Sequence, residues 1–219
     1  MEKKILFVAT NIDAIEGGNE TGLWLQEFVE PATECKQAGF EVTGVSLKGG
    51  RIPIDPNSYS NELPRVWDGV MEPIHNTDKL ENIDLNDYAG IFFTGGHGTM
   101  FDFPNQSVIQ SALQHFIEHD KVIGAVCHGP AAFVGVKDAN GDSFIKGKTI
   151  TGFTNKEEEK AGLTDKMPFL LQDKLSAEGA EFQTSEPFKE HVEVDGKLVT
   201  GQNSQSSLAT AEAFIKQIR

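Results

Sequence analysis

The sequence predicts an α/β fold, in which a mostly parallel central sheet is covered by helices on both faces. Three short runs, residues 4–9, 89–94 and 121–126, are almost entirely apolar, which is typical of parallel strands buried on both faces. Amphipathic segments lie between these runs, most clearly residues 105–119, where apolar side chains recur at helical spacing. Since strands and helices alternate along the chain, crossover helices should cover both sides of the sheet.

The first half of the chain contains two strong strand patterns and one long helix pattern. Pro31 lies inside the helix pattern and predicts a kink or a break, and Gly39 should end it. Residues 48–75 hold several prolines and no clear periodicity, so we expect a long ordered loop with short elements. The elements expected here are a strand at 4–9, a polar loop at 11–20, a helix at 21–38, a strand at 41–47, a short helix at 78–83 and a strand at 89–94.

The second half continues the alternation and ends in a small hairpin and a helix. Asp195-Gly196 is a dipeptide typical of a tight hairpin turn. The elements expected here are a helix at 105–119, a strand at 121–126, a short helix at 131–134, a strand at 148–153, helices at 155–161 and 166–178, strands at 182–184, 191–194 and 197–200, and a helix at 206–219. Without an internal repeat or a linker, residues 1–219 are expected to form one domain.

The charge of the chain excludes some classes of partner. The formal net charge is −14, which repels phosphate backbones and anionic lipid headgroups, so neither nucleic acid nor a membrane surface is an expected partner. The amino terminus has no apolar stretch of signal-peptide or membrane-span length. We therefore expect a cytoplasmic protein whose two cysteines, Cys35 and Cys127, are free thiols.

Cys127 is the first candidate for chemistry. It follows a buried strand and precedes small residues that should begin a helix, and Ala125-Val126-Cys127-His128-Gly129 has the layout of a nucleophile elbow. Ligands of open α/β sheets bind at the carboxyl ends of the strands, where a helix N-terminus would lower the pKa of a thiol. We therefore predict an ionised, solvent-accessible nucleophile. The alternative is a small buried cysteine at the end of a strand.

Two further motifs are expected beside this cysteine. His128 is a candidate base or proton shuttle, and its backbone N–H is a candidate oxyanion donor; the alternative is a surface histidine at a helix start. Gly95-Gly96-His97-Gly98 follows a buried strand and could turn further N–H groups toward an oxyanion, or be only a flexible connection. The chain has no dinucleotide fingerprint and no phosphate-loop lysine. No metal is expected, because His97 has no partner at ligand spacing.

Glu27 is the first candidate carboxylate. It comes three and four residues after Trp24 and Leu23, so it borders the apolar stripe of the predicted helix. A partly buried carboxyl there would have a raised pKa and could serve as acid or base. The alternative is an ordinary exposed glutamate on a helix.

Three consecutive glutamates, Glu157, Glu158 and Glu159, form the second group of carboxylates. One of them could orient His128. The alternative is a capping box, since Thr154 and Asn155 each have a glutamate three residues later.

At this point the motifs resemble a known family. The chain is similar to the ThiJ/PfpI family of the class I glutamine amidotransferase-like superfamily, and within it to the branch of the thirty-one-kilodalton heat-shock chaperones and glyoxalase III enzymes. The resemblance covers nearly the whole chain and rests on the segments 95–102 (GGHGTMFD), 125–130 (AVCHGP), 21–27 (TGLWLQE), 150–154 (ITGFT) and 199–203 (VTGQN).

This resemblance implies a fold and a set of residue roles. The fold would be a flavodoxin-like three-layer sandwich, assembled as a homodimer. Cys127 would be the nucleophile, His128 its triad neighbour and Glu27 the carboxylate beside the thiol. Gly95, Gly96 and the following His97, together with His128, would form the substrate and oxyanion site. Glu158 fits best as the acid on His128, although three glutamates in a row leave the register open.

The resemblance also implies a reaction. It is the conversion of methylglyoxal, a small 2-oxoaldehyde, to lactate without glutathione or any other cofactor. Deglycation is a further activity proposed for the family. The alternatives are a cysteine peptidase or amidase, a non-enzymatic holding chaperone, and an oxidative-stress sensor in which Cys127 becomes a sulfinic acid.

Overall fold

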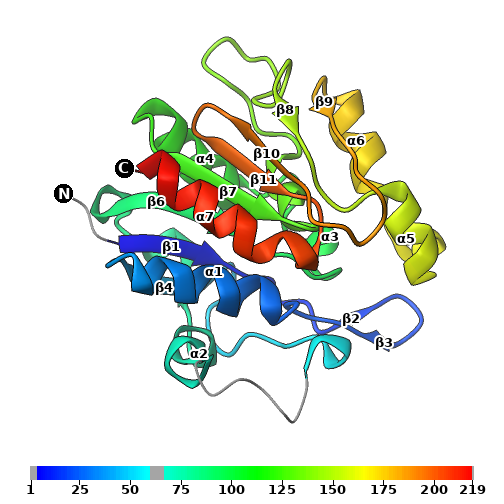
Figure 1. Cartoon of the computed structure of the whole chain (residues 1–219), viewed down its shortest axis with the longest axis horizontal. Helices are drawn as coiled ribbons and strands as arrows, with labels where there is room; N and C mark the ends of the chain where they lie inside the picture. Colours follow the sequence, from blue (N-terminus) through cyan, green and yellow to red (C-terminus); the bar gives the residue numbers. More distant parts are fainter. Residues whose placement is uncertain (1–3, 60–66, 219) are drawn as a thin grey trace.

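A seven-stranded, mostly parallel sheet forms the centre of the molecule (Figure 1). The computed structural model describes residues 4–59 and 67–218, except for the side chain of Asp68. The strand order is β10-β11-β7-β6-β1-β4-β5, and only the β10–β11 pair is antiparallel. The strands are β1 (Lys4–Val8), β4 (Glu41–Ser46), β5 (Asp78–Lys79), β6 (Tyr88–Phe93), β7 (Val122–Val126), β10 (Val192–Asp195) and β11 (Leu198–Gly201).

Helices cover both faces of this sheet, which confirms the predicted flavodoxin-like α/β sandwich. Helices α1 (Gln26–Gln37) and α7 (Ser207–Ile218) lie side by side on one face, and α4 (Ser107–Glu118) lies on the other (Figure 1). Helix α2 (Asp68–His75) packs against β4. In the described part of the chain, no helix has the length and apolar character that a membrane crossing requires.

Aromatic rings join the sheet to the paired helices α1 and α7. Phe7 of β1 contacts Phe28 of α1 edge to face, with ring centroids 5.3 Å apart, and Phe92 of β6 contacts Phe214 of α7 in the same way at 5.5 Å. Phe7 and Phe92 stack on each other at 5.1 Å. A Cβ at Gly124 of β7 would strike the rings of Phe92 and Phe214, so a glycine is needed there for the helix to approach the sheet.

Several short elements lie outside the central sheet. They are the hairpin β2 (Ala14–Ile15) and β3 (Asn19–Glu20), the parallel pair β8 (Thr149–Ile150) and β9 (Glu181–Phe182), helices α3 (Thr99–Asp102), α5 (Asn155–Ala161) and α6 (Leu171–Ala177), and the 3₁₀ turns Pro56–Ser58, Leu80–Asn82, Leu85–Asp87, Gly129–Phe133, Thr164–Lys166 and Ser204–Ser206. The helix predicted at 155–161 is found with those bounds.

Two predictions about residues 11–38 were wrong. The polar loop contains the hairpin β2–β3, and the helix predicted to begin at residue 21 begins at Gln26. Leu23 is extended instead, because its N–H donates to the carbonyl of Pro53 and it pairs with Ile54 across a β-bridge. The helix runs through Pro31 without a break.

Four later predictions also need correction. The helix predicted at 78–83 is β5 followed by a 3₁₀ turn, and the one at 131–134 is the 3₁₀ turn Gly129–Phe133. The predicted strand 148–153 is ordered as a strand only at Thr149–Ile150, and it pairs with β9 instead of joining the central sheet. The helix predicted at 166–178 is the shorter α6. Residues 60–66 of the long loop and the predicted helix end at Arg219 lie outside the described residues.

Candidate active site

Cys127 lies at the carboxyl end of β7, in a turn with a left-handed backbone. Its φ is 60°, one of four positive values among the described non-glycine residues. Its N–H donates to the carbonyl of Gly201 at 2.9 Å, and its carbonyl accepts from the N–H of Phe153 at 2.8 Å. A Cβ at Gly129 would press on the carbonyl of Phe93, so the turn needs a glycine there. Hydrogen bonds and packing therefore hold the elbow in this strained conformation.

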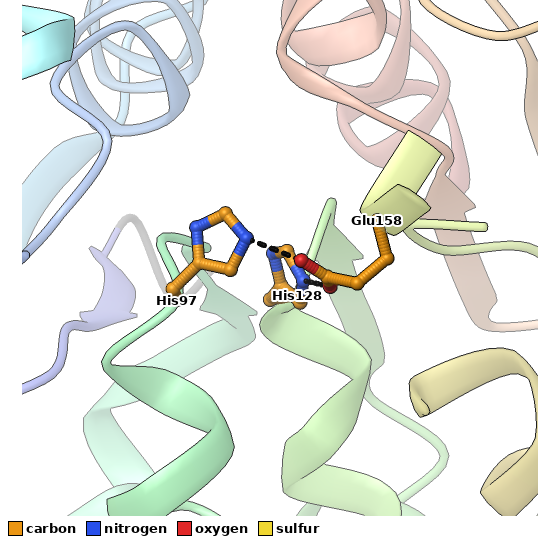
Figure 2. A group of neighbouring side chains, drawn as sticks. All are labelled: His97, His128 and Glu158. Carbon is orange, nitrogen blue, oxygen red and sulfur yellow. Dashed lines mark hydrogen bonds and ion pairs between the residues drawn. The ribbon is translucent and has the colours of Figure 1, made fainter. Parts of the chain in front are cut away.

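His128, Glu158 and His97 form one hydrogen-bonded group beside the elbow (Figure 2). The Glu158 carboxylate, on α5, accepts two hydrogen bonds of 2.7 Å. Its Oε2 accepts from Nε2 of His128, and its Oε1 accepts from Nε2 of His97. The Sγ of Cys127 lies 3.4 Å from Nδ1 of His128. The ring of His128 contacts those of His97 and Phe153, with centroid distances of 4.3 and 4.4 Å.

The two contacts of Glu158 fix the tautomer of His128. Burial favours protonated Glu158, but its contacts with His128 and His97 outweigh burial and hold its pKa well below the usual range. A carboxylate only accepts hydrogen bonds, so Nε2 of both imidazoles carries a hydrogen. Burial, followed by the charge of His97, lowers the pKa of His128. Neutral His128 therefore turns a bare Nδ1 toward the sulfur, as a proton acceptor needs.

Glu27 approaches the sulfur from α1. Its side chain is buried, and neither oxygen makes a hydrogen bond of full geometry within the described part of the chain. Burial raises the pKa of Glu27 to about 8, although the nearby Cys127 thiol and the Gly95 N–H lower it. A Cβ at Gly95 would strike the Glu27 carboxyl, so a glycine allows the acid to reach the elbow. Glu27 is therefore protonated at neutral pH.

The expectation of an exposed, ionised Cys127 was wrong. The residue is only 6% exposed. Burial, followed by repulsion from an ionised Glu27, raises the pKa of the thiol well above its usual value, and the His128 N–H lowers it. The element after the elbow is a five-residue 3₁₀ turn, so the helix N-terminus that was to lower this pKa is missing. These two shifts favour a neutral thiol next to a neutral His128.

The glycine loop brings backbone N–H groups to the same place. Gly95 and Gly96 follow β6, and Gly96 has a φ of 105°. A side chain at Gly96 would collide with the carbonyl of Gly22, which brings the segment before α1 against this loop. The Gly95 N–H lowers the pKa of Glu27, and the His128 N–H lowers the pKa of the Cys127 thiol. In the described part of the chain, the Gly96 N–H has no backbone acceptor, so Gly96 and His128 are the better oxyanion donors.

Glu157, next to Glu158, has a different task that the sequence only partly indicated. The capping box with Thr154 is present, as the motif predicted. The same carboxylate also accepts from the Phe188 N–H at 2.8 Å, Gln202 Nε2 at 3.1 Å and Asn203 Nδ2 at 2.8 Å. With the two donors of Thr154 it accepts five hydrogen bonds, and it ties α5 to the segments around 188 and 202. Glu159 is exposed.

We expect Glu157→Gln to destabilise the fold strongly. An amide in this position turns an NH₂ group toward buried donors, leaving several unpaired, so the loss should be about 3–5 kcal/mol. For a chain of this size this lowers the melting temperature by roughly 10 °C. The matched control is Glu159→Gln on the same helix, which should melt within about 1 °C of the parent, as measured by calorimetry. Equal melting temperatures for both variants would contradict the structural role of Glu157.

Among the described residues, His97, His128 and Glu158 are close enough together to be considered as metal ligands. One donor atom from each of His97, His128 and Glu158 lies within 4.8 Å of the others. Nε2 of both histidines and both oxygens of Glu158 are already used in two hydrogen bonds, and both Nε2 atoms carry hydrogens. A metal would have to displace those protons and both hydrogen bonds. The structure thus gives His97 the partners that the sequence did not reveal, and they suit hydrogen bonding better than metal binding.

Comparison with known proteins shows the family and agrees with this fold. The model of the DJ-1/PfpI family matches residues 20–217, and the chain belongs to this family. The glutathione-independent glyoxalase HSP31 of Saccharomyces cerevisiae is 30% identical, covering 99% of this chain and 98% of its own. The crystal structure of glyoxalase III from Candida albicans superposes with a TM-score of 0.87 at 30% identity, covering 99% and 97%. The Rapid Encystment Protein of 24 kDa from Francisella tularensis gives 0.94 at 38%, covering 99% of both chains.

The structure brings the predicted site residues together. Cys127, His128, Glu27 and Glu158 meet at the carboxyl edge of β6 and β7, and Gly95, Gly96 and His97 line the same place. Of the three consecutive glutamates, Glu158 is the one that contacts His128. Sequence reasoning missed the contact between the His97 imidazole and Glu158, and the Phe153 ring on His128. His97 and Phe153 lie in segments that the motifs singled out. Their contacts join segments that are far apart in the sequence, so no local pattern could predict them.

Proposed function

We propose that the protein is a glutathione-independent glyoxalase that converts methylglyoxal to lactate, with Cys127 as the nucleophile. The observation that carries the proposal is the placement of a protonated acid and a neutral base around one sulfur, with Glu27 from α1 and His128 from the turn after β7. A 2-oxoaldehyde needs both, since its conversion moves a proton between adjacent carbons. The relatives named as glyoxalases, which match almost the whole chain, support the same reaction.

The first step forms a hemithioacetal. As the Sγ of Cys127 attacks the aldehyde carbon, its proton passes to Nδ1 of His128, and Glu158 stabilises the imidazolium. The N–H groups of Gly96 and His128 stabilise the negative charge on the former aldehyde oxygen. Glu27 then gives its proton to this oxygen and becomes a carboxylate.

The second step rearranges the hemithioacetal to a thioester. The Glu27 carboxylate removes the hydrogen from the former aldehyde carbon, while His128 gives its proton to the ketone oxygen, forming an enediol. Glu27 returns the proton to the second carbon and takes the hydroxyl proton from the first. The product is a lactoyl thioester on Cys127, with Glu27 protonated and His128 neutral again. Water, activated by His128, hydrolyses the thioester, so the net reaction is methylglyoxal plus water to lactate.

The enclosure of the sulfur favours a small substrate over a polypeptide. Cys127 is 6% exposed, and Phe153 covers His128 beside it. A two-carbonyl compound of few atoms can reach such a sulfur, whereas a peptidase must lay an extended chain across it. The narrow access therefore favours the glyoxalase over the peptidase.

We expect purified protein to form D-lactate from methylglyoxal without glutathione, and EDTA to leave the rate within about twofold of the untreated enzyme. Enzymatic determination of D-lactate over time measures both. Heat-denatured protein is the control for the spontaneous reaction. Absence of lactate above that control would refute the proposed function, and loss of the rate in EDTA that zinc restores would refute the metal-free mechanism.

A further inference from the structure

We propose that His97 is a positioning residue, whose imidazole shares the Glu158 carboxylate with His128 and thereby keeps His128 available as a proton acceptor at neutral pH. The inference rests on the proposed role of His128 in the reaction. It concerns a side chain that the triad logic does not need, since Glu158 alone could orient His128.

His97 and His128 make matching contacts with Glu158. Nε2 of His97 and Nε2 of His128 bind different oxygens of one carboxylate at the same distance of 2.7 Å (Figure 2). A carboxylate that accepts two strong donors has less negative charge to offer to either. Glu158 therefore stabilises an imidazolium at His128 less than it would with His128 as its only partner.

His97 also lies against the ring of His128. The ring centroids are 4.3 Å apart, and both side chains are buried. A charge on His97 therefore opposes a charge on His128, which lowers the pKa of His128 after the larger effect of burial. The rings of His97 and Phe153 both contact the ring of His128, and their own centroids lie 5.8 Å apart, so they cover adjoining sides of it.

The other ionisable groups around this pair come from three elements. Glu158 and Glu157 are on α5, Cys127 lies in the turn directly after β7, and Glu27 is on α1. Glu158 and Glu157 raise the pKa of His128, whereas burial and His97 lower it. Removing His97 thus leaves Glu158 as a stronger partner and removes a repulsive charge. Both changes act in one direction, toward a higher pKa of His128.

The test compares His97→Leu with His97→Gln. Leucine has a similar size but no hydrogen bond, whereas glutamine can still donate to Glu158. Long-range ¹H–¹⁵N spectra of protein with ¹⁵N-labelled histidine rings follow the titration of His128 directly, with or without substrate. We expect the midpoint of His128 to rise by about one pH unit in His97→Leu and by clearly less in His97→Gln.

The pH dependence of kcat gives the second measurement. A base that must be neutral loses activity as the pH falls through its pKa, so the acid limb in His97→Leu should move upward by the same amount as the spectroscopic midpoint. At a pH below the midpoints of both proteins we expect its kcat to be about tenfold lower than that of the parent, with less loss in His97→Gln. KM should change little, because the hydrogen bond acts on His128 and not on the substrate.

An unchanged His128 midpoint in His97→Leu would overturn the inference, and so would equal shifts in the two variants. The Nε2–H tautomer of neutral His128, read from the same spectra, shows whether each variant keeps its folded site. A shifted midpoint in a protein that makes no lactate would support the positioning role and refute the glyoxalase. Lactate formation together with an unshifted His128 midpoint would support the glyoxalase and refute the positioning role of His97.

Discussion

Cys127→Ala is expected to lower kcat for lactate formation by about 10⁴-fold or more. The reason is that every covalent step of the proposed reaction takes place on this sulfur, and neither Glu27 nor His128 can replace it as a nucleophile toward the aldehyde. D-lactate formed in the absence of glutathione is the measurement. Mass spectrometry of enzyme quenched during turnover should show a lactoyl adduct on the peptide that contains Cys127 and on no other. The adduct makes this peptide about 72 Da heavier.

The matched control for this variant is Cys35→Ala. Cys35 is the other free thiol, and it is buried in α1 with its pKa raised to about 12, mainly by burial. Its replacement should retain activity to within about twofold while lowering stability by roughly 1 kcal/mol. A Cys127→Ala enzyme that keeps its rate would refute the nucleophile, and a Cys35→Ala enzyme that loses activity while remaining folded would place a catalytic thiol elsewhere.

Glu27→Gln is expected to lower activity by about 10³-fold while stabilising the fold. An amide of the same shape cannot take up or return the proton that the second step moves. In the folded protein the pKa of Glu27 is raised from 4.5 to about 8. The folded state therefore holds a proton that the unfolded state releases, and stability is lost as the pH rises from 4.5 to 8. Over this window Glu27 costs about 1.4 kcal/mol per pH unit.

Glutamine removes this pH-dependent cost, so the two proteins should differ more as the pH rises. Near pH 4.5 their free energies of unfolding should be similar, and at pH 8 the variant should be more stable by a few kcal/mol. Urea unfolding at a series of pH values measures this difference. Glu34→Gln, on the same helix but partly exposed, is the control and should show no such trend. A constant difference at all pH values would mean that the carboxyl of Glu27 has an ordinary pKa.

Much of the fold could be predicted because apolar pattern determines where strands lie. The runs at 4–9, 89–94 and 121–126 became β1, β6 and β7, in the centre of the sheet. The errors fall where long-range pairing overrides local preference. Leu23 has a helical neighbourhood in the sequence, but its bond to Pro53 and its pairing with Ile54 hold it extended.

The candidate site divides in the same way. The elbow, the glycine loop and Glu27 could be recognised because each has a local signature. The protonation state of Cys127 could not, since it depends on burial and on a carboxyl about one hundred residues away in the chain, and here the prediction failed. Glu158 could be separated from Glu157 only when the fold showed which face of α5 lies toward His128 and which holds Thr154, Gln202 and Asn203.

The left-handed backbone at Cys127 makes the proposed nucleophile a strained position of the fold. Any residue with a Cβ loses on the order of 1 kcal/mol at a φ of 60°, and only glycine escapes this penalty. A chain selected only for stability would favour glycine at position 127. With Cys127 as the proposed nucleophile, this cost is the stability given up for its reactivity, and we expect Cys127→Gly to raise the melting temperature while abolishing the reaction.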